Sequence, residues 1–204
     1  MESSNLTIMK SNRKKLVIVL LIFILPAMLA TLMYAIGWRP SNTVNHGELI
    51  VPARPLENSE MQSLAGKTVK LDELHGKWLM VYFDTSACPE ECIKQLYFMR
   101  QIHMSQGKHL DKIQRVFILT DESSLEPLKP KLIEYANMMV LKADKLTLAV
   151  LRKEFGMDES VKTEQRNIYF VDPLGNLMMQ YHPGVEPAGM RKDLERLLKY
   201  SSDN

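Results

Sequence analysis

Cys88 and Cys92 are the residues of this 204-residue sequence whose type and spacing are best suited to chemistry. They are its only two cysteines, and they stand four positions apart. Residues at this spacing on a helix have Cα atoms about 6 Å apart, a separation that a disulfide tolerates. The pair can therefore close into a disulfide, open to two thiols or hold a soft metal ion.

The cysteine pair lies between an apolar run that favours a strand, residues 78–83, and a segment of helical character, residues 91–104. A strand that turns directly into a helix brings cysteines close to unpaired backbone N–H groups. We expect both sulfur atoms to project from the first helical turn, with Cys88 the more exposed. Glu90 and Glu91 disfavour a thiolate beside them, which argues against a strongly oxidising enzyme.

The segment 16–37 carries no charge and is long enough to cross a hydrocarbon core of about 30 Å as a helix. Four basic residues precede it: Lys10, Arg13, Lys14 and Lys15. The positive-inside rule predicts that residues 1–15 stay in the cytoplasm and that the chain after 37 lies on the periplasmic side of an inner membrane. The apolar segment is long for a signal peptide and no good cleavage site follows it, so a single-pass anchor is the favoured interpretation.

The charge after the anchor is nearly balanced, with 22 basic and 23 acidic residues, and does not indicate a nucleic-acid surface. On the periplasmic side, an oxidising compartment, neighbouring cysteines form disulfides by default. A structural staple is the alternative interpretation of the pair. Because a loop closed between residues four apart constrains the unfolded chain little, redox or metal chemistry explains the pair better.

The rest of the chain predicts an extended tether over 38–66 and one folded domain over 67–204. Within the tether, the short run 48–51 could instead add an edge strand to the domain. The domain alternates helical segments with β-favouring runs at 68–71, 78–83, 115–120, 138–141, 168–171 and 177–181. This order predicts an α/β, thioredoxin-like fold with a mixed central sheet flanked by helices, in which the last two strands form an antiparallel hairpin.

The stretch Gly76-Lys-Trp-Leu-Met-Val-Tyr-Phe-Asp-Thr-Ser-Ala-Cys-Pro-Glu-Glu-Cys92 resembles the Sco/SenC family. The hallmark of that family is a Cys-Pro-x-x-Cys pair after a Gly-Lys-x-x-Leu-x-Tyr-Phe strand. The resemblance implies a membrane-anchored assembly factor for cytochrome c oxidase, acting on an oxidase subunit or another redox or copper protein. It implies that Cys88 and Cys92 bind copper as Cu(I), or form a redox pair that manages the thiols of the oxidase copper site.

The family's third copper ligand, a histidine shortly before the hairpin, has no counterpart in residues 163–167. Two thiolates give Cu(I) a soft pair and leave a third position open. We expect none of the five histidines to ligate, with His182 as the remaining candidate if the chain folds back. The others are expected in the tether (His46), at the far end of the central strand (His75) and on the surface (His103, His109).

Three functions follow from the sequence. The first is a Sco-like assembly factor that handles Cu(I) or thiols. The second is a general membrane-tethered thiol–disulfide oxidoreductase, although Asn167 stands where such enzymes usually place a proline beside their cysteines. The third is a non-catalytic interaction module that retains the fold. If the chain is an enzyme, it is at most a thiol–disulfide oxidoreductase.

Overall fold

The computed structural model of the chain describes residues 2–37, 45–135, 137–157 and 166–201. The chain divides into two compact units, Met1–Val44 and Asn45–Asn204. The first contains helix α1 (Glu2–Ala35), in which the stretch Lys15–Ala35 is long and apolar enough to cross a membrane. No other helix in the described ranges meets that test of length and composition. The predicted candidate for a single membrane span is therefore present.

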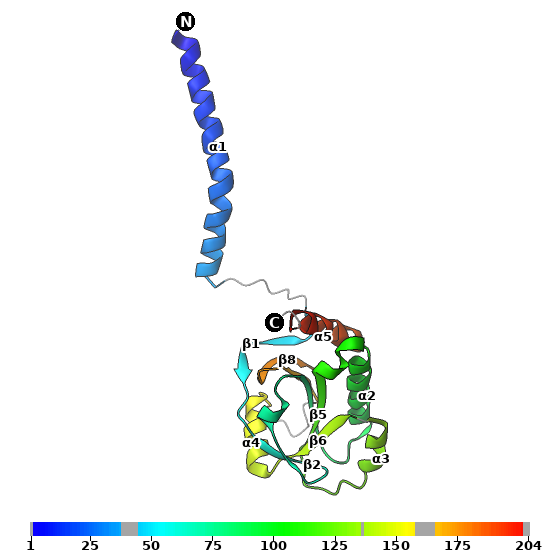
Figure 1. The fold of residues 1–204 in the computed structure, drawn as a ribbon. Coiled ribbons are helices and arrows are strands. Elements are labelled where there is room, and N and C mark those ends of the chain that lie inside the picture. Colours follow the sequence, from blue (N-terminus) through cyan, green and yellow to red (C-terminus); the bar gives the residue numbers. More distant parts are fainter. Residues whose placement is uncertain (1, 38–44, 136, 158–165, 202–204) are drawn as a thin grey trace. The chain divides into compact units, whose positions relative to one another are not determined.

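The second unit is built on an eight-stranded sheet with the strand order β1-β8-β7-β4-β5-β6-β2-β3 (Figure 1). The strands are β1 (Glu48–Pro55), β2 (Glu60–Ser63), β3 (Thr68–Lys70), β4 (Trp78–Asp84), β5 (Ile113–Leu119), β6 (Met138–Lys142), β7 (Ile168–Val171) and β8 (Asn176–Tyr181). The helices are α2 (Glu90–Met104), α3 (Lys129–Leu132), α4 (Lys145–Glu154) and α5 (Pro187–Ser201), with 3-10 turns η1 (Leu71–Leu74), η2 (Gly107–Lys112) and η3 (Ile133–Tyr135).

The centre of the sheet has the predicted connectivity. Strands β4 and β5 are parallel and α2 lies between them in sequence, so the cysteine-containing segment is the crossover of a parallel pair. Strand β6 adds parallel to β5, whereas β7 and β8 form the expected antiparallel hairpin beside β4. This mixed sheet with flanking helices confirms the thioredoxin-like α/β fold.

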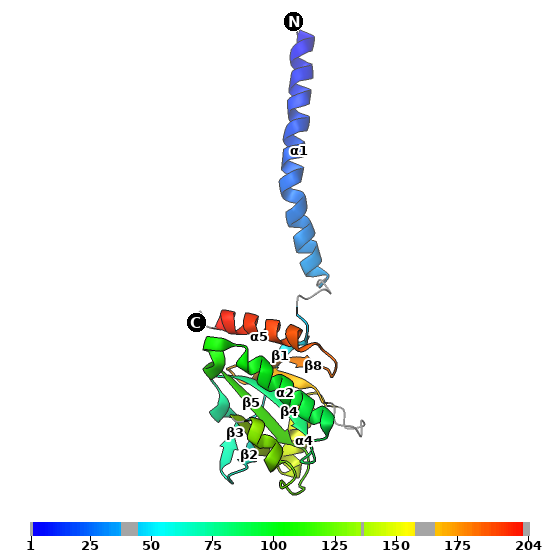
Figure 2. The ribbon, with the colours of Figure 1, turned by 90° about the vertical axis from the view of Figure 1, so that its right-hand side faces the viewer.

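Strand β4 is buried along its whole length and separates two apolar cores. Because side chains alternate across a strand, Met80 and Tyr82 face α2 and α5, whereas Val81 and Phe83 face α4. Figures 1 and 2 show α2 and α5 on one side of the sheet and α4 on the other. The end of β4 thus lies between two packed layers of side chains. The residues that follow it start from a strand that is fixed on both faces.

The prediction of a tether reaching to residue 66 is wrong. Strand β1 pairs with β8, and β2 pairs with both β3 and β6, so the folded unit begins at Asn45 rather than at residue 67. The alternative that 48–51 adds an edge strand is the correct one. Strand β1 is hard to predict from the sequence because it is mostly exposed and its apolar and polar residues do not alternate. It also contains Pro52 and Pro55, which an edge strand accommodates.

Candidate functional site

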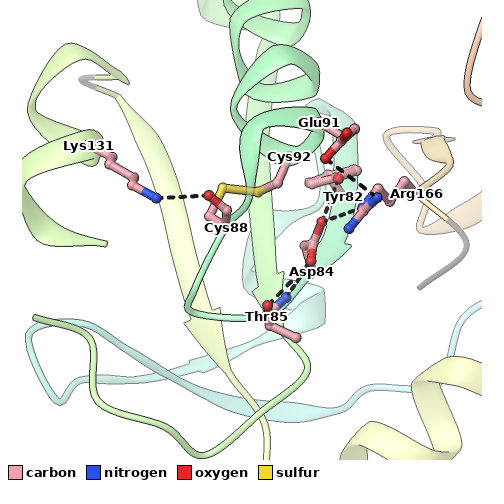
Figure 3. A network of polar contacts seen from close by, with 8 residues as sticks. All are labelled: Tyr82, Asp84, Thr85, Cys88, Glu91, Cys92, Lys131 and Arg166. Atoms are coloured by element: carbon pink, nitrogen blue, oxygen red, sulfur yellow. Dashed lines mark hydrogen bonds and ion pairs between the residues drawn. A yellow bond between two sulfur atoms is a disulfide. The ribbon is translucent and has the colours of Figure 1, made fainter. Parts of the chain in front are cut away.

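Cys88 and Cys92 form a disulfide at the junction between β4 and α2, with their Cα atoms 5.1 Å apart (Figure 3). The prediction that the pair lies within disulfide reach is confirmed. Two details differ from expectation. Helix α2 begins at Glu90 with Pro89 at its N-cap, so Cys88 precedes the helix and only Cys92 lies in its first turn.

Both cysteines are fully buried, with 0% of either residue exposed, so the expectation that Cys88 is the more exposed of the two is wrong. They belong to the apolar core that also contains Tyr82, Leu96 and Leu128. Cys88 has a φ of +38°, in the left-handed region that side chains with a Cβ atom rarely adopt. The sequence suggested exposure because the pair follows a strand end, but it could not reveal which segment packs over that end.

Asp84, the last residue of β4, is the polar centre beside the disulfide (Figure 3). Only 1% of it is exposed. Its Oδ2 atom accepts hydrogen bonds from the Tyr82 hydroxyl at 2.9 Å and from Nε of Arg166 at 3.1 Å, and its Oδ1 accepts one from the backbone N–H of Thr85 at 2.8 Å. A buried carboxylate requires such partners, because desolvation otherwise penalises its charge.

Arg166 connects this carboxylate to helix α2. It lies two positions before the start of β7, after a stretch outside the described residues, and its Nη1 atom is 3.9 Å from Oε2 of Glu91. Burial opposes the charge of Arg166, but the hydrogen bond from its Nε and the charge of Asp84 outweigh burial and raise its pKa. A permanent guanidinium cation is therefore fixed close to the first turn of the cysteine helix.

Two further contacts hold the loop that carries Cys88. Nζ of Lys131, from α3, donates to the carbonyl oxygen of Ala87 at 3.0 Å. It also donates to the carbonyl oxygen of Cys88 at 2.9 Å, the contact drawn in Figure 3. On the other side, Asp121 accepts hydrogen bonds from the backbone N–H and the hydroxyl of Ser86 at 2.7 and 2.9 Å. Burial opposes the charge of Asp121, yet hydrogen bonds from Ser86 and Ser123 outweigh it and lower the pKa of this carboxyl group.

The described residues contain no group of three or more His, Cys, Asp or Glu side chains arranged to hold a metal ion. His182, the substitute ligand considered from the sequence, is engaged elsewhere: its Nδ1 lies 3.2 Å from Oδ1 of Asn167 and its Nε2 lies 3.0 Å from Oε2 of Glu48. Segment 163–167 is described only from Arg166 onward. On reduction, the site therefore offers two thiolates, a donor set that fits Cu(I) and does not fit the tetragonal nitrogen and oxygen set of Cu(II).

The other histidines lie at other places in the fold. His103 is buried rather than on the surface: its Nδ1 accepts from Nε of Arg115 at 3.1 Å, and its Nε2 donates to the Leu110 carbonyl at 2.8 Å. His46 is exposed as expected, but its backbone N–H donates to the buried Asp193 at 2.7 Å, which helps to fix the start of the folded unit. His75 is exposed in the turn before β4, and His109 is half-buried in η2.

A family model described as "Transmembrane-like, thioredoxin-like, C-terminal domain" matches residues 78–201. The chain belongs to this family. The match begins at β4 and includes the cysteine pair, Asp84, Lys131 and Arg166. This thioredoxin-like domain has no match among curated proteins.

Solved structures of Sco proteins share the fold of this thioredoxin-like domain. ScoI of Bradyrhizobium japonicum with copper bound has a TM-score of 0.57 at 20% identity, covering 70% of this chain and 98% of that chain. Apo Sco1 of Thermus thermophilus has a TM-score of 0.62 at 16% identity, covering 79% and 99%. The resemblance to Sco proteins is thus confirmed at the level of the fold.

The fold is shared with a protein named for thiol chemistry as well. The thioredoxin domain of a thiol–disulfide oxidoreductase from Bacteroides vulgatus has a TM-score of 0.57 at 16% identity, covering 73% of this chain and 99% of that chain. At such identities the likeness establishes the thioredoxin-like architecture alone. Function has to be argued from the site itself.

Sequence reasoning found the two cysteines and missed the residues that surround them. Asp84 carried a signal, because a carboxylate that ends an otherwise apolar strand has to find partners when it is buried. Lys131 and Arg166 carried none. They reach the site from segments about 40 and 80 positions away along the chain, which only the packed fold brings to the cysteine loop.

Proposed function

We propose that this chain is a membrane-anchored, Sco-like thiol–disulfide protein that acts on the cysteines of the cytochrome c oxidase copper site during assembly. The observation that carries the proposal is the closed Cys88–Cys92 pair at the junction of β4 and α2, with no third metal ligand grouped beside it in the described residues. The domain works on the periplasmic side of the inner membrane, held by α1.

The reaction is a two-electron exchange. A thiolate of the reduced Cys88/Cys92 pair attacks a disulfide in the partner and forms a mixed disulfide, releasing one partner sulfur as a thiolate. The second cysteine then attacks the mixed disulfide, which leaves the partner with two thiols and this chain with the closed pair seen in the structure. Two electrons and two protons pass to the partner. Regeneration requires a dithiol reductant in the same compartment.

The experiment uses the reduced full-length protein in detergent and an oxidase subunit whose copper-site cysteines are oxidised to a disulfide. Free thiols on both proteins are counted by alkylation and mass spectrometry at intervals. We expect loss of two thiols from this chain for every two gained by the subunit, and no transfer by the Cys88→Ser/Cys92→Ser double variant. Transfer to insulin at the same rate would favour a general oxidoreductase. If cells carrying the double variant show an unchanged assembly phenotype, the cysteines are not needed, and a non-catalytic interaction module is the only one of the three functions that remains.

Carriage of Cu(I) is the second candidate, favoured by the two sulfur atoms that the reduced site brings together and by the copper bound to the ScoI neighbour. In this function copper is cargo: Cys88 and Cys92 hold Cu(I) until the partner takes it. Titration of the reduced protein with Cu(I) in competition with a chelator tests it. Stoichiometric binding supports the function, and failure to bind removes copper and leaves thiol exchange.

A further inference from the structure

The fully buried disulfide shares its apolar core with a short segment that also donates hydrogen bonds to the cysteine loop. This cover, defined here as residues 125–135, contains α3 and η3. Its Leu128 is 0% exposed and lies in the same apolar core as Cys88 and Cys92. From the same segment, Lys131 reaches the cysteine loop and donates to the carbonyl oxygens of Ala87 and Cys88 (Figure 3).

The backbone hydrogen bonds of the cover are few and local. Helix α3 is a single turn of four residues that includes Pro130, and its backbone hydrogen bonds are local, from Leu128 to Leu125 and from Leu132 to Leu128. Ile133 is 79% exposed. A segment whose backbone hydrogen bonds are short-range opens at a lower free-energy cost than a central strand or helix. Leu128 and Tyr135 anchor the cover in the apolar core, and Lys131 supplies its hydrogen bonds to the cysteine loop.

We propose that residues 125–135 form a cover that must open before the Cys88–Cys92 pair can exchange, and that Lys131 is the positioning residue that holds it closed. This inference rests on the proposed thiol function. A thiolate attacks a disulfide along the S–S axis, so a fully buried sulfur atom cannot be reached from solvent. Because the ammonium group of Lys131 bonds the carbonyl of Cys88 itself, opening of the cover and release of the cysteine loop are one event.

The test measures reduction of the oxidised full-length protein by dithiothreitol. One dithiothreitol thiolate attacks a protein sulfur atom, and its second thiol displaces that sulfur, giving cyclic oxidised dithiothreitol and the free Cys88 and Cys92 thiols. Lys131→Met should speed this reduction about fivefold, the change expected when roughly one net hydrogen bond to the closed state is lost. Lys131→Arg, which keeps the donor and the charge, should remain close to wild type.

The chain offers a matched control two positions away. Lys129 lies on the same turn, but its Nζ pairs with the exposed Glu126 at 2.6 Å, so Lys129→Met should leave the reduction rate unchanged. Equal acceleration by Lys129→Met, or none by Lys131→Met, would overturn the proposal. So would wild-type reduction as fast as that of the urea-unfolded protein, since no cover would then protect the pair.

A second measurement separates the cover from a general loss of stability. Losing the hydrogen bonds of Lys131 destabilises the closed state, so the free energy of unfolding should fall along with that of opening, and the route of reduction decides between them. Amide hydrogen exchange at 125–132 should be faster in Lys131→Met than in Lys129→Met, and the reduction rate should depend only weakly on urea below the unfolding transition, because opening the cover exposes little surface. A reduction rate that rises with urea as steeply as global unfolding would make Lys131 merely structural. The dithiothreitol assay does not need the protein partner, so it tests the cover independently of the proposed function. If the disulfide is protected from dithiothreitol but no transfer to the oxidase subunit occurs, the proposed function is refuted and the proposal of a cover stands.

Discussion

Nε of Arg166 donates a hydrogen bond to Oδ2 of Asp84 over 3.1 Å and so joins the segment before β7 to the end of β4 beside the disulfide. The contact brings together residues that are 82 positions apart in the chain. The contact places the guanidinium cation of Arg166 near the first turn of α2 and ties the end of β4, from which the cysteine loop starts, to the segment before β7.

Removing the charge of Asp84 should destabilise the domain. In Asp84→Asn, Arg166 loses the closer of its two ionic partners and the Tyr82 hydroxyl is left with a weaker acceptor. The free energy of unfolding should therefore fall by about 2 kcal/mol, less than for a fully buried pair because Arg166 is partly exposed. Urea denaturation measures this. The control is Lys70→Met, whose pair with Glu60 is exposed and screened by solvent, so its free energy of unfolding should stay close to that of wild type. Equal stability of the two variants would contradict this account.

The fold should lose stability as pH falls below about 6.5 because of His103. Burial is the main cause that lowers the pKa of His103, and the charges of Arg115 and Lys77 add to it. The unfolded chain therefore binds the proton more readily than the folded chain. The contribution of neutral His103 to stability is fully present above the pKa of His103 in the unfolded chain and is lost as the pH falls below that pKa. His103→Gln keeps an acceptor for Arg115 and a donor for Leu110. It should flatten the curve of stability against pH in this window; an unchanged curve would exclude His103 as its source.

A second loss is expected under alkaline conditions. Burial raises the pKa of Tyr169 to about 12, against a hydrogen bond from Asn167 that lowers it. The folded state then holds a proton that the unfolded state releases, so the contribution of this residue to stability is complete below pH 10 and falls by about 3 kcal/mol between pH 10 and 12. Tyr169→Phe should remove that part of the slope and leave the rest, to which Tyr181 also contributes through its raised pKa. Equal alkaline slopes for the variant and wild type would disprove the assignment.

The two-thiolate site should bind Cu(I) once it is reduced and bind Cu(II) poorly. Because the family's histidine has no counterpart in residues 163–167, Glu164→His and Asn167→His are the substitutions that the sequence suggests for supplying a third ligand. Glu164 lies outside the described residues, and the Asn167 side chain bonds the Tyr169 hydroxyl, which belongs to the core on the other face of the sheet from the cysteines. Arg166 faces the cysteine side through Asp84.

We therefore expect Arg166→His, rather than Asn167→His, to raise the Cu(II) affinity of the reduced protein. Titration of both variants and the wild type with Cu(II), followed by the thiolate-to-copper charge-transfer band, gives the comparison. Tight Cu(II) binding by the wild type would show that a ligand is missing from this account, and His182→Ala would be the next variant to measure.

The orientation of the anchor can be tested directly. Because Lys10, Arg13, Lys14 and Lys15 precede the apolar segment, alkaline phosphatase fused after Asn204 should be active, as it is only outside the cytoplasm. Replacing the four basic residues by glutamine should reduce that activity. A fusion that is active only with a cytoplasmic reporter would reverse the topology and place the cysteine pair in a reducing compartment.

The sequence by itself determined the parts of this protein that depend on local patterns. The uncharged run 16–37 predicts a membrane span from its length alone, the alternating β-favouring runs predict the α/β order, and the spacing of Cys88 and Cys92 predicts a pair that can close. Each of these rests on neighbours within a few positions, which a sequence displays directly. Strand β1 was not predicted as a full strand, because an edge strand with prolines and exposed side chains carries no such local pattern.

Only the tertiary structure decided what surrounds the cysteines. Cys88 shares its core with Leu128 and its carbonyl accepts a hydrogen bond from Lys131, while Asp84 accepts one from Arg166, so the surroundings of the pair arise from contacts between segments distant in sequence. A lysine or an arginine in a loop is by default a solvated surface residue. Which one is turned inward is set by the side chains that pack around it once the sheet has formed, and that information is absent from any local stretch of the chain.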